Sequence, residues 1–149
     1  MLIVATRPDG SYNMMTASWG TMGTLWGESV CTVYIRPQRY TYGFAEEGTK
    51  MSLCFFDDSH REVLGICGTK SGRDIDKTAV CGLTPLRTDD GTVYFEEATD
   101  VFLLKKLYAQ DLEEDAFLDK APLAYYEARD FHRAYVCKVL EVLTTAETD

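Results

Sequence analysis

One stretch near the start of the chain, Asn13–Gly20, has residue types suited to holding a small ligand. It combines an amide, two hydroxyls and a tryptophan where a barrel strand would be expected to alternate apolar and polar residues. Backbone amides and short polar side chains suit the edges of a flat ligand, and an aromatic or methionine side chain suits its face. The alternative for Trp19 is a place in the core. We predict a ligand wall made of Asn13, Met15, Thr16, Ala17, Ser18 and Trp19.

Two later segments, Arg36–Thr41 and Lys70–Arg73, could bind the anionic tail of such a ligand. Arginine forms bidentate, charge-assisted bonds with phosphate, and the start of a helix offers free backbone amides. Alternatively, these arginines lie on the surface and pair with Asp74 and Asp76. Two such segments in an acidic chain favour an anion site, for which the candidates are Arg36, Arg39, Tyr40, Thr41, Lys70, Ser71, Gly72, Arg73 and Lys77.

Motifs for other chemistries are missing from the sequence. No Gly-x-Gly-x-x-Gly follows a strand, and neither a Gly-x-Ser-x-Gly elbow nor a His-Glu-x-x-His motif is present. Five cysteines without a Cys-x-x-Cys pair fit neither a disulfide framework nor a zinc site, so buried free thiols are expected. We assign no catalytic side chain and no metal ligand. His132 either edges the ligand pocket or has a structural or surface role.

Composition describes an ordinary globular domain, and we expect residues 1–149 to form one domain. A formal charge of −9 argues against a general nucleic-acid binder. No apolar run approaches the roughly 20 residues of a membrane span, and the first residues do not resemble a signal peptide. We therefore expect a cytoplasmic protein that binds neither nucleic acid nor membrane.

Strand-like runs separated by turn signals dominate the chain. Strands are expected at residues 2–6, 13–18, 29–36, 50–56, 92–95, 98–108 and 131–143. Residues 19–28, punctuated by glycines, are expected to form an irregular loop or one helical turn. Residues 109–130 hold seven acidic and two basic side chains and predict a solvated surface excursion, and the last six residues are expected to fray.

Short helices are expected between the strands. Thr41 is predicted to cap a helix that runs through Glu47 and ends at Gly48 in a left-handed conformation. The Ser59–Glu62 spacing is that of a capping box, which predicts a helix to about Cys67. A further turn or two is expected within 74–80 and ends before Gly82. Six or seven strands with such insertions predict a small antiparallel barrel.

Five segments, taken in order, resemble the flavin reductase-like, FMN-binding split-barrel family, and specifically its flavoredoxin-like branch. They cover nearly the whole chain: Asn13–Gly20, Arg36–Thr41, Phe55–Asp57, Cys67–Lys77 and Gly82–Pro85. The resemblance implies a mainly β, Greek-key split barrel that forms a homodimer with FMN near the interface. By position, Asn13–Trp19 would line the isoalloxazine, whereas the two arginine-bearing segments would bind the phosphate and ribityl tail. Family members usually carry a segment ahead of the first strand, on which this chain almost begins, so contacts of such a segment are not carried over.

Two functions are open under this resemblance. One is an oxidoreductase in which NADH or NADPH passes a hydride to the flavin N5, a step that needs no acid or base side chain. The other is a non-enzymatic FMN electron carrier that exchanges electrons with a redox protein partner, for which the acidic 109–130 stretch would be a docking face. A third alternative is a fold that has lost flavin and binds something else.

Overall fold

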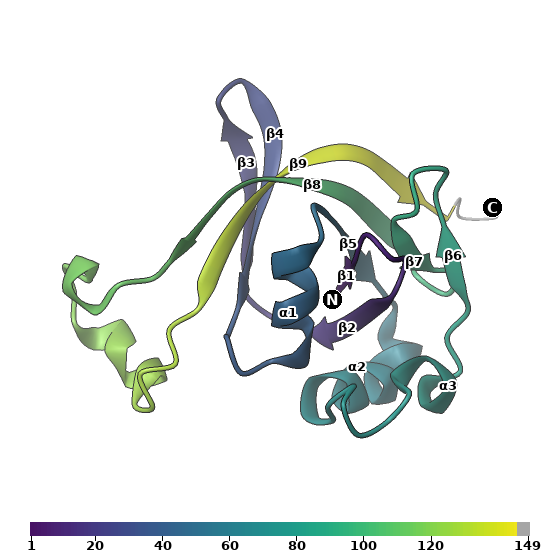
Figure 1. Cartoon of the computed structure of the whole chain (residues 1–149), viewed down its shortest axis with the longest axis horizontal. Coiled ribbons are helices and arrows are strands. Elements are labelled where there is room, and N and C mark those ends of the chain that lie inside the picture. The colour runs from purple at the N-terminus through teal and green to yellow at the C-terminus, as the bar shows by residue number, and fades with distance from the viewer. Residues whose placement is uncertain (146–149) are drawn as a thin grey trace.

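The structure is a computed structural model that describes residues 1–145 of the chain, so the predicted fraying of the end, where it concerns residues 146–149, lies outside the described residues. Within residues 1–145, nine strands and three α-helices follow one another, with short 3₁₀ turns between some of them (Figure 1). The strands are β1 Leu2–Thr6, β2 Tyr12–Thr16, β3 Gly20–Leu25, β4 Glu28–Ile35, β5 Lys50–Phe55, β6 Pro85–Arg87, β7 Val93–Phe95, β8 Asp100–Asp111 and β9 Arg133–Thr144. The helices are α1 Tyr40–Glu47, α2 Arg61–Thr69 and α3 Lys77–Cys81.

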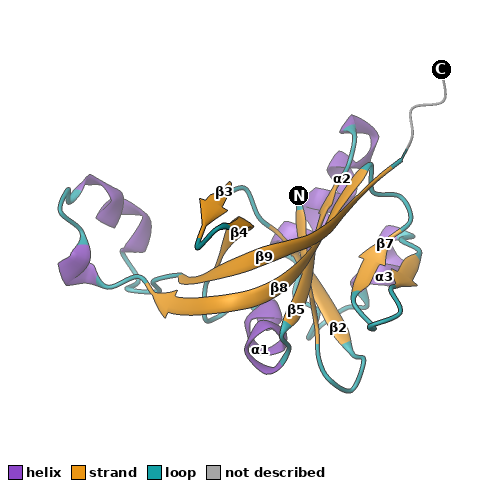
Figure 2. Cartoon of the chain, turned by 90° about the horizontal axis from the view of Figure 1, so that it is seen from above, coloured by secondary structure: helices purple, strands orange, loops and turns teal. Residues whose placement is uncertain are grey.

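Seven strands form one curved antiparallel sheet in the order β2-β1-β5-β8-β9-β4-β3. The two outer strands, β2 and β3, do not pair with each other, so the barrel stays split along one side. Figures 1 and 2 show α1 beside this sheet, and Figure 1 shows the pair α2 and α3 beyond β2. The predicted class, a mainly β, Greek-key split barrel with short inserted helices, is confirmed.

Both faces of β1 are buried, which explains its continuous apolar sequence. Successive side chains of a strand point to opposite faces. Accordingly, Leu2 and Val4 enter one core cluster with Met14, whereas Ile3 and Ala5 enter the other. Each fully buried aliphatic side chain stabilises the fold by about 1.5–3 kcal/mol relative to exposure. The hairpin β1–β2, which carries the predicted ligand wall, is therefore firmly held.

The prediction of an irregular loop or one helical turn at residues 19–28 was wrong, because this segment contains β3. A two-residue turn with positive φ at Trp26 (54°) and Gly27 (73°) joins β3 to β4, in the conformation that tight hairpins require. Every residue of β3 is exposed, so neither face imposes an apolar–polar alternation on the sequence. The short strand β6 was also not expected; it pairs only with β7.

Helix α1 has the expected end but not the expected cap. The N-cap residue is Arg39, without a side-chain cap bond, and Thr41 lies inside the helix. Gly48 follows the helix with φ −85°, so the prediction of a left-handed residue was wrong. A Cβ at position 48 would lie 2.0 Å from the carbonyl oxygen of Thr6, and close approach of two backbones explains the glycine.

The predicted capping box at the start of the second helix was also wrong. Asp57, not Ser59, accepts the capping bond, from the backbone N–H of Ser59, and α2 then begins at Arg61. Helix α3 is capped by the Asp76 carboxylate and ends, as expected, at Gly82, here with φ 63°.

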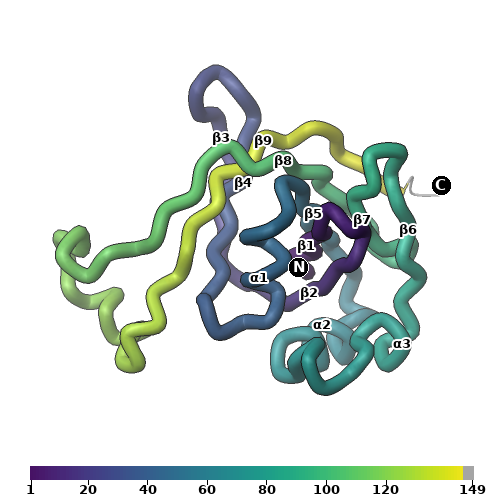
Figure 3. The backbone as a smooth tube through the Cα atoms, in the orientation of Figure 1, coloured from purple at the N-terminus to yellow at the C-terminus, as the bar shows by residue number. Residues whose placement is uncertain are grey.

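Residues 112–132 leave the sheet between β8 and β9 as a long excursion (Figure 3). Two 3₁₀ turns, Glu114–Ala116 and Ala121–Tyr126, lie within it, and the Leu118 side chain is 100% exposed. The predicted surface excursion is therefore present. Its returning limb, however, contacts the rim of the barrel through Tyr125 and Asp130 rather than being solvated along its whole length.

Candidate functional site

The predicted site residues gather around two neighbouring pockets that share Arg39. The first, which we call the rim pocket, has a volume of about 220 Å³; the second, the loop pocket, has about 130 Å³. The rim pocket is lined by Met15, Thr16, Ala17, Ser18, Trp19, Tyr34, Arg36, Arg39 and His132. The loop pocket is lined by Asn13, Gln38, Arg39, Tyr40, Thr41, Thr69, Lys70, Ser71, Arg73 and Lys77. Of the predicted residues, Gly72 alone lines neither pocket.

Aromatic rings form the outer wall of the rim pocket. Trp19 is 42% exposed, which excludes the alternative that it is a core residue. Its ring meets the Tyr125 ring edge-on at 5.2 Å between centroids and lies 5.1 Å from the His132 ring. Tyr34 completes this wall and was not predicted. It lies on β4, which is brought near the residues that follow β2 only when the sheet curves. The pocket therefore offers flat apolar surfaces that are open to solvent.

Backbone amides form another part of the rim pocket. Among residues 1–145, no acceptor is found for the backbone N–H of Ser18 or Trp19, whereas the N–H of Ala17 donates to the carbonyl oxygen of Met1 at 3.0 Å. The hydroxyl of Thr16 is also engaged, since it donates to the carbonyl oxygen of Leu64 at 2.6 Å. The two amides after Ala17 are thus among the donors left for a ligand edge.

His132 belongs to the rim pocket, so the reading in which it edges the pocket is the one the structure favours. It is only 8% exposed, and its Nδ1 lies 2.8 Å from the Tyr126 hydroxyl. Burial, helped by the nearby Arg36 charge, lowers the pKa of His132 to about 4. The imidazole is consequently neutral near pH 7 and presents an uncharged ring to the pocket.

Arg36 lines the rim pocket, but its positive charge is already paired with a carboxylate. Its guanidinium pairs with the Asp130 carboxylate and donates to the carbonyl oxygen of Tyr125 at 2.9 Å. Gln38 donates to the same carboxylate at 2.5 Å. These contacts hold the returning limb of the excursion against the rim. Arg36 therefore positions Tyr125 beside Trp19 and is a weaker anion ligand than the sequence suggested.

The cations of the loop pocket lack such partners. Within residues 1–145, Arg39, Lys70, Arg73 and Lys77 form no ion pair. Arg73 instead stacks over the Tyr40 ring at 4.8 Å, and the Asp76 carboxylate caps α3, so the expected alternative of pairing with Asp74 and Asp76 is not observed.

One of these cations is buried, and a second is partly buried. Lys77 is 4% exposed and donates to the carbonyl oxygens of Met14 at 2.9 Å and Cys67 at 3.1 Å. Arg39 donates to Gly68 at 2.8 Å and to the same Cys67 carbonyl at 3.3 Å. Burial lowers the pKa of both groups. Buried charges are normally matched by opposite charge, so this arrangement creates a local demand for an anion.

Polar neighbours shape the same pocket. Asn13 is buried and donates through Nδ2 to the Thr41 hydroxyl oxygen at 2.7 Å, which is the only hydrogen bond of that hydroxyl within residues 1–145. The Thr41 proton therefore remains available to an anion. At Gly72, a Cβ would lie 2.1 Å from Asn13 Oδ1, so only glycine lets the 70–76 loop pass this side chain.

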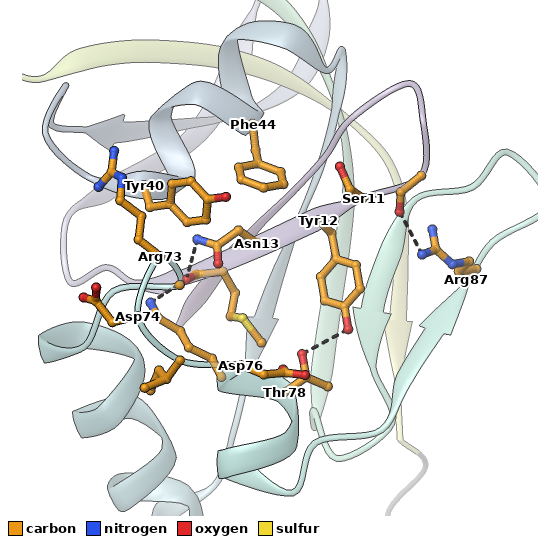
Figure 4. A pocket seen from close by; sticks show the side chains of 15 residues that line it. Ser11, Tyr12, Asn13, Tyr40, Phe44, Arg73, Asp74, Asp76, Thr78 and Arg87 are labelled. Carbon is orange, nitrogen blue, oxygen red and sulfur yellow. Dashed lines mark hydrogen bonds between the residues drawn. The ribbon is translucent and has the colours of Figure 1, made fainter.

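A larger cavity of about 620 Å³ adjoins the loop pocket and was not predicted (Figure 4). The two share Asn13, Tyr40, Arg73 and Lys77, and Gly72 lines the larger one. Figure 4 shows Arg73 beside Tyr40 at one end and Arg87 near Tyr12 at the other. Because it draws on the β1–β2 turn, β6 and α3 together, no single stretch of sequence indicated it.

This sequence and fold were compared with those of known proteins. A family model described as the flavin reductase like domain matches residues 1–147. The chain belongs to this flavin reductase-like family. Solved structures share its fold at low sequence identity, whereas no curated protein matches the sequence.

Three structures illustrate the shared fold. The FMN-binding protein from Thermus thermophilus, solved with p-hydroxybenzaldehyde, is 21% identical, with a TM-score of 0.76 over 98% of this chain and 71% of its own. Flavoredoxin of Desulfovibrio vulgaris is 19% identical, with a TM-score of 0.75 over 97% and 68%. Flavoredoxin from Methanosarcina acetivorans is 18% identical, with a TM-score of 0.74 over 98% and 68%. The split barrel of this flavin reductase-like chain is thus the fold of all three.

Other kinds of site find no support in the part of the chain that the structure covers. No group of three or more His, Cys, Asp or Glu side chains is arranged to hold a metal ion. No helix is both long and apolar enough to cross a membrane. All five cysteines are free, as expected, and Cys81 alone is not fully buried. The rim and loop pockets remain the best candidate site of this flavin reductase-like chain.

Proposed function

We propose that this chain binds FMN, with the isoalloxazine in the rim pocket and the phosphate tail in the loop pocket, and acts as a flavin oxidoreductase. One observation carries the proposal. Lys77 is a buried cation and Arg39 is a partly buried one, and neither has a carboxylate partner in residues 1–145. Arg39 also lines the aromatic-walled rim pocket. A ligand with a flat ring at one end and a phosphate at the other satisfies both pockets. Membership of the flavin reductase-like family and the FMN-binding name of one structural neighbour support it.

The residues present fit such a group. Arg39, Lys77 and the Thr41 hydroxyl would bind the phosphate, with Lys70, Ser71 and Arg73 around it. Trp19 would contact the ring face, and the backbone amides of Ser18 and Trp19 would donate to its polar edge. Neutral His132 would close the pocket without adding charge.

When bound, FMN would supply a two-electron acceptor that takes hydride at N5 from NADH or NADPH. The chain's part would be to hold the ring against Trp19 and to stabilise negative charge at its edge through preorganised amides. No side chain in the rim pocket needs to exchange a proton, in agreement with the absence of an assigned catalytic residue.

A second candidate is an FMN electron carrier that serves protein partners. The observation in its favour is the acidic excursion, whose 109–130 stretch holds seven acidic and two basic side chains and adjoins the rim pocket through Tyr125. A basic redox protein docked there would lie near the proposed ring site. Two of the structural neighbours are named flavoredoxins.

We further propose a homodimer of a single-domain, cytoplasmic protein. The fully exposed outer strand β3 presents Met22 and Leu25. In the turn that follows, the exposed Trp26 ring lies 6.2 Å from the ring of the exposed Tyr108 on β8, centroid to centroid. An exposed apolar strand edge of this kind is normally covered in a native assembly. Five free thiols suit a reducing compartment.

Anaerobic spectroscopy of the purified full chain separates the functions. Flavin absorbance that bleaches rapidly on addition of NADH or NADPH supports the oxidoreductase. Flavin that is bleached by dithionite or by a reduced basic redox protein, but by neither nicotinamide, supports the carrier and rejects the reductase. A colourless protein that takes up no added FMN rejects both. Arg39→Ala should weaken FMN uptake in either case.

A further inference from the structure

Two cysteines bracket the loop that supplies the cations of the loop pocket. Cys67 lies near the end of α2, and Cys81 is the last residue of α3. Their sulfur atoms are 3.9 Å apart, in direct contact. The 14-position interval between them contains Lys70, Ser71, Gly72, Arg73 and Lys77. The pair thus forms the base of the anion-binding loop.

We propose that Cys67 and Cys81 form a reversible disulfide when the protein meets a hydroperoxide, and that this bond alters the loop pocket. Neither cysteine lines a pocket of the proposed FMN site, so formation of the bond does not itself depend on FMN binding.

Exposure sets the order of events. Cys81 is half-buried and can be reached from solvent, whereas Cys67 is fully buried, and burial raises the pKa of its thiol to about 12. The thiolate is the reactive form, so Cys81 is the thiol that meets the oxidant. Cys67 then serves as the resolving thiol, already in contact.

The chemistry balances with hydrogen peroxide as the oxidant. The Cys81 thiolate attacks one peroxide oxygen, an S–O bond forms, the O–O bond breaks, and hydroxide leaves to be protonated to water. Cys67 loses its proton and attacks the sulfenic sulfur; the S–S bond forms, the S–O bond breaks, and a second water leaves. Two thiols are oxidised by two electrons and one peroxide is reduced to two waters.

The bond requires the sulfur atoms to approach by about 1.9 Å, from 3.9 Å to the covalent distance. That movement acts on the anion site, because the Cys67 carbonyl is the shared acceptor of Arg39 and Lys77. Pulling α2 towards α3 shifts this oxygen and with it both cations. The oxidised protein should therefore bind an anion less well than the reduced protein.

A second cysteine pair provides an internal control. Cys31 on β4 lies directly opposite Cys137 on β9 in the sheet. Both are buried, at 1% and 0% exposure, so neither can meet the oxidant. Proximity alone would allow both pairs to oxidise, whereas the proposal requires the Cys67–Cys81 pair to react first.

The test is peroxide treatment of the reduced full chain followed by intact-mass and peptide analysis. We expect a loss of two hydrogens, a cross-linked peptide joining Cys67 to Cys81, and full recovery with dithiothreitol. Cys81→Ser should abolish the cross-link, and Cys31→Ser should leave it unchanged. A cross-link between Cys31 and Cys137, or over-oxidation of Cys81 to sulfinic acid without a cross-link, would overturn the proposal.

The effect on the loop pocket is measured by titrating FMN into both forms. We expect the dissociation constant to rise about tenfold on oxidation, the equivalent of one charge-assisted hydrogen bond, and to recover on reduction. Equal affinity of the two forms would refute the coupling. This second readout rests on the proposed function, whereas the mass readout does not. A chain that forms the cross-link but never binds FMN would count against the proposed function alone.

Discussion

Arg39 and Lys77 donate to one and the same carbonyl oxygen, that of Cys67, although neither has a carboxylate partner within residues 1–145. Two positive charges converging on a neutral acceptor repel each other. An anion placed between them would relieve that repulsion and restore part of the solvation lost by burial.

Inorganic phosphate should stabilise the protein even without a flavin. A ligand that binds only the folded state at 100 times its dissociation constant adds about 2.7 kcal/mol to the free energy of unfolding. Arg39→Gln should remove most of this gain. The exposed Arg61→Gln, which disturbs a surface pair with Asp58, should keep it. Thermal unfolding in matched phosphate and chloride solutions of equal ionic strength measures the difference, and an equal gain in both variants would contradict the anion site.

Gly72→Ala should displace the anion-binding loop. The new methyl group would overlap Asn13 Oδ1 and would lie 3.0 Å from a Tyr40 ring carbon. Overpacking at such a site typically destabilises by about 1–3 kcal/mol and should weaken FMN binding as well. Gly65→Ala is the matched control, because its methyl group would meet nothing within 4 Å on the exposed face of α2. That variant should be neutral or more stable by up to about 1 kcal/mol, as judged by denaturant unfolding.

His132 should make stability depend on pH in mildly acidic solution. Its pKa is lowered to about 4 in the folded state, against 6.5 when unfolded, so between these values the unfolded chain binds the extra proton. Stability contributed by the neutral imidazole is therefore complete above pH 6.5 and is lost as pH falls towards 4. His132→Gln should flatten the slope in this window by up to about 1.4 kcal/mol per pH unit. Urea unfolding from pH 4 to 7 tests this, with His60→Gln retaining the slope due to His132.

Trp19 should report ligand binding through its fluorescence. It lines the rim pocket, whereas Trp26 lies at the far end of β3, about 20 Å away by the rise of an extended strand. We expect added FMN to quench emission strongly in the wild type and in Trp26→Phe, and weakly in Trp19→Phe. Loss of quenching in the Trp26 variant alone would place the ring elsewhere. Because Trp19 is exposed, neither Trp19→Phe nor Trp26→Phe should change the unfolding temperature much.

Met22→Glu should dissociate the proposed homodimer. The side chain is 57% exposed on β3, so a charge there would not disturb the core of one protomer. In a dimer interface, however, a buried unpaired carboxylate would be strongly unfavourable. Sedimentation equilibrium should show a monomer for this variant and a dimer for the wild type. A wild-type protein that remains a monomer at high concentration would reject the interface.

The strands buried on at least one face could be predicted from the sequence, because burial imposes a pattern. β1 is buried on both sides and reads as a continuous apolar run, and β4 carries β-branched residues up to Pro37. β3 has no buried face, so its sequence carries no apolar–polar pattern that would distinguish it from a loop. Exposure on both sides removes the very constraint that sequence reasoning uses.

The site was foreseen as a set of residues but not as a set of interactions. Segment order and the family resemblance grouped Thr41 with Lys77, and in the structure both line one pocket. Local spacing, however, gave Thr41 a capping role, whereas its hydroxyl meets Asn13 across 28 positions of sequence. Arg36 was read as an anion ligand because its partner, Asp130, lies 94 positions away. Contacts of this range are set by sheet topology, which no local motif encodes.

The backbone of the excursion between β8 and β9 can be cut without unfolding the sheet. Both limbs run straight into a long antiparallel ladder, which extends from Asp111 paired with Arg133 to Asp100 paired with Thr144. A backbone break at the fully exposed Leu118 would leave that ladder intact, so the two fragments should stay associated. The same point should accept an inserted peptide tag or new chain termini. Position 118 thus offers a place from which to label or tether the molecule while its two pockets remain whole.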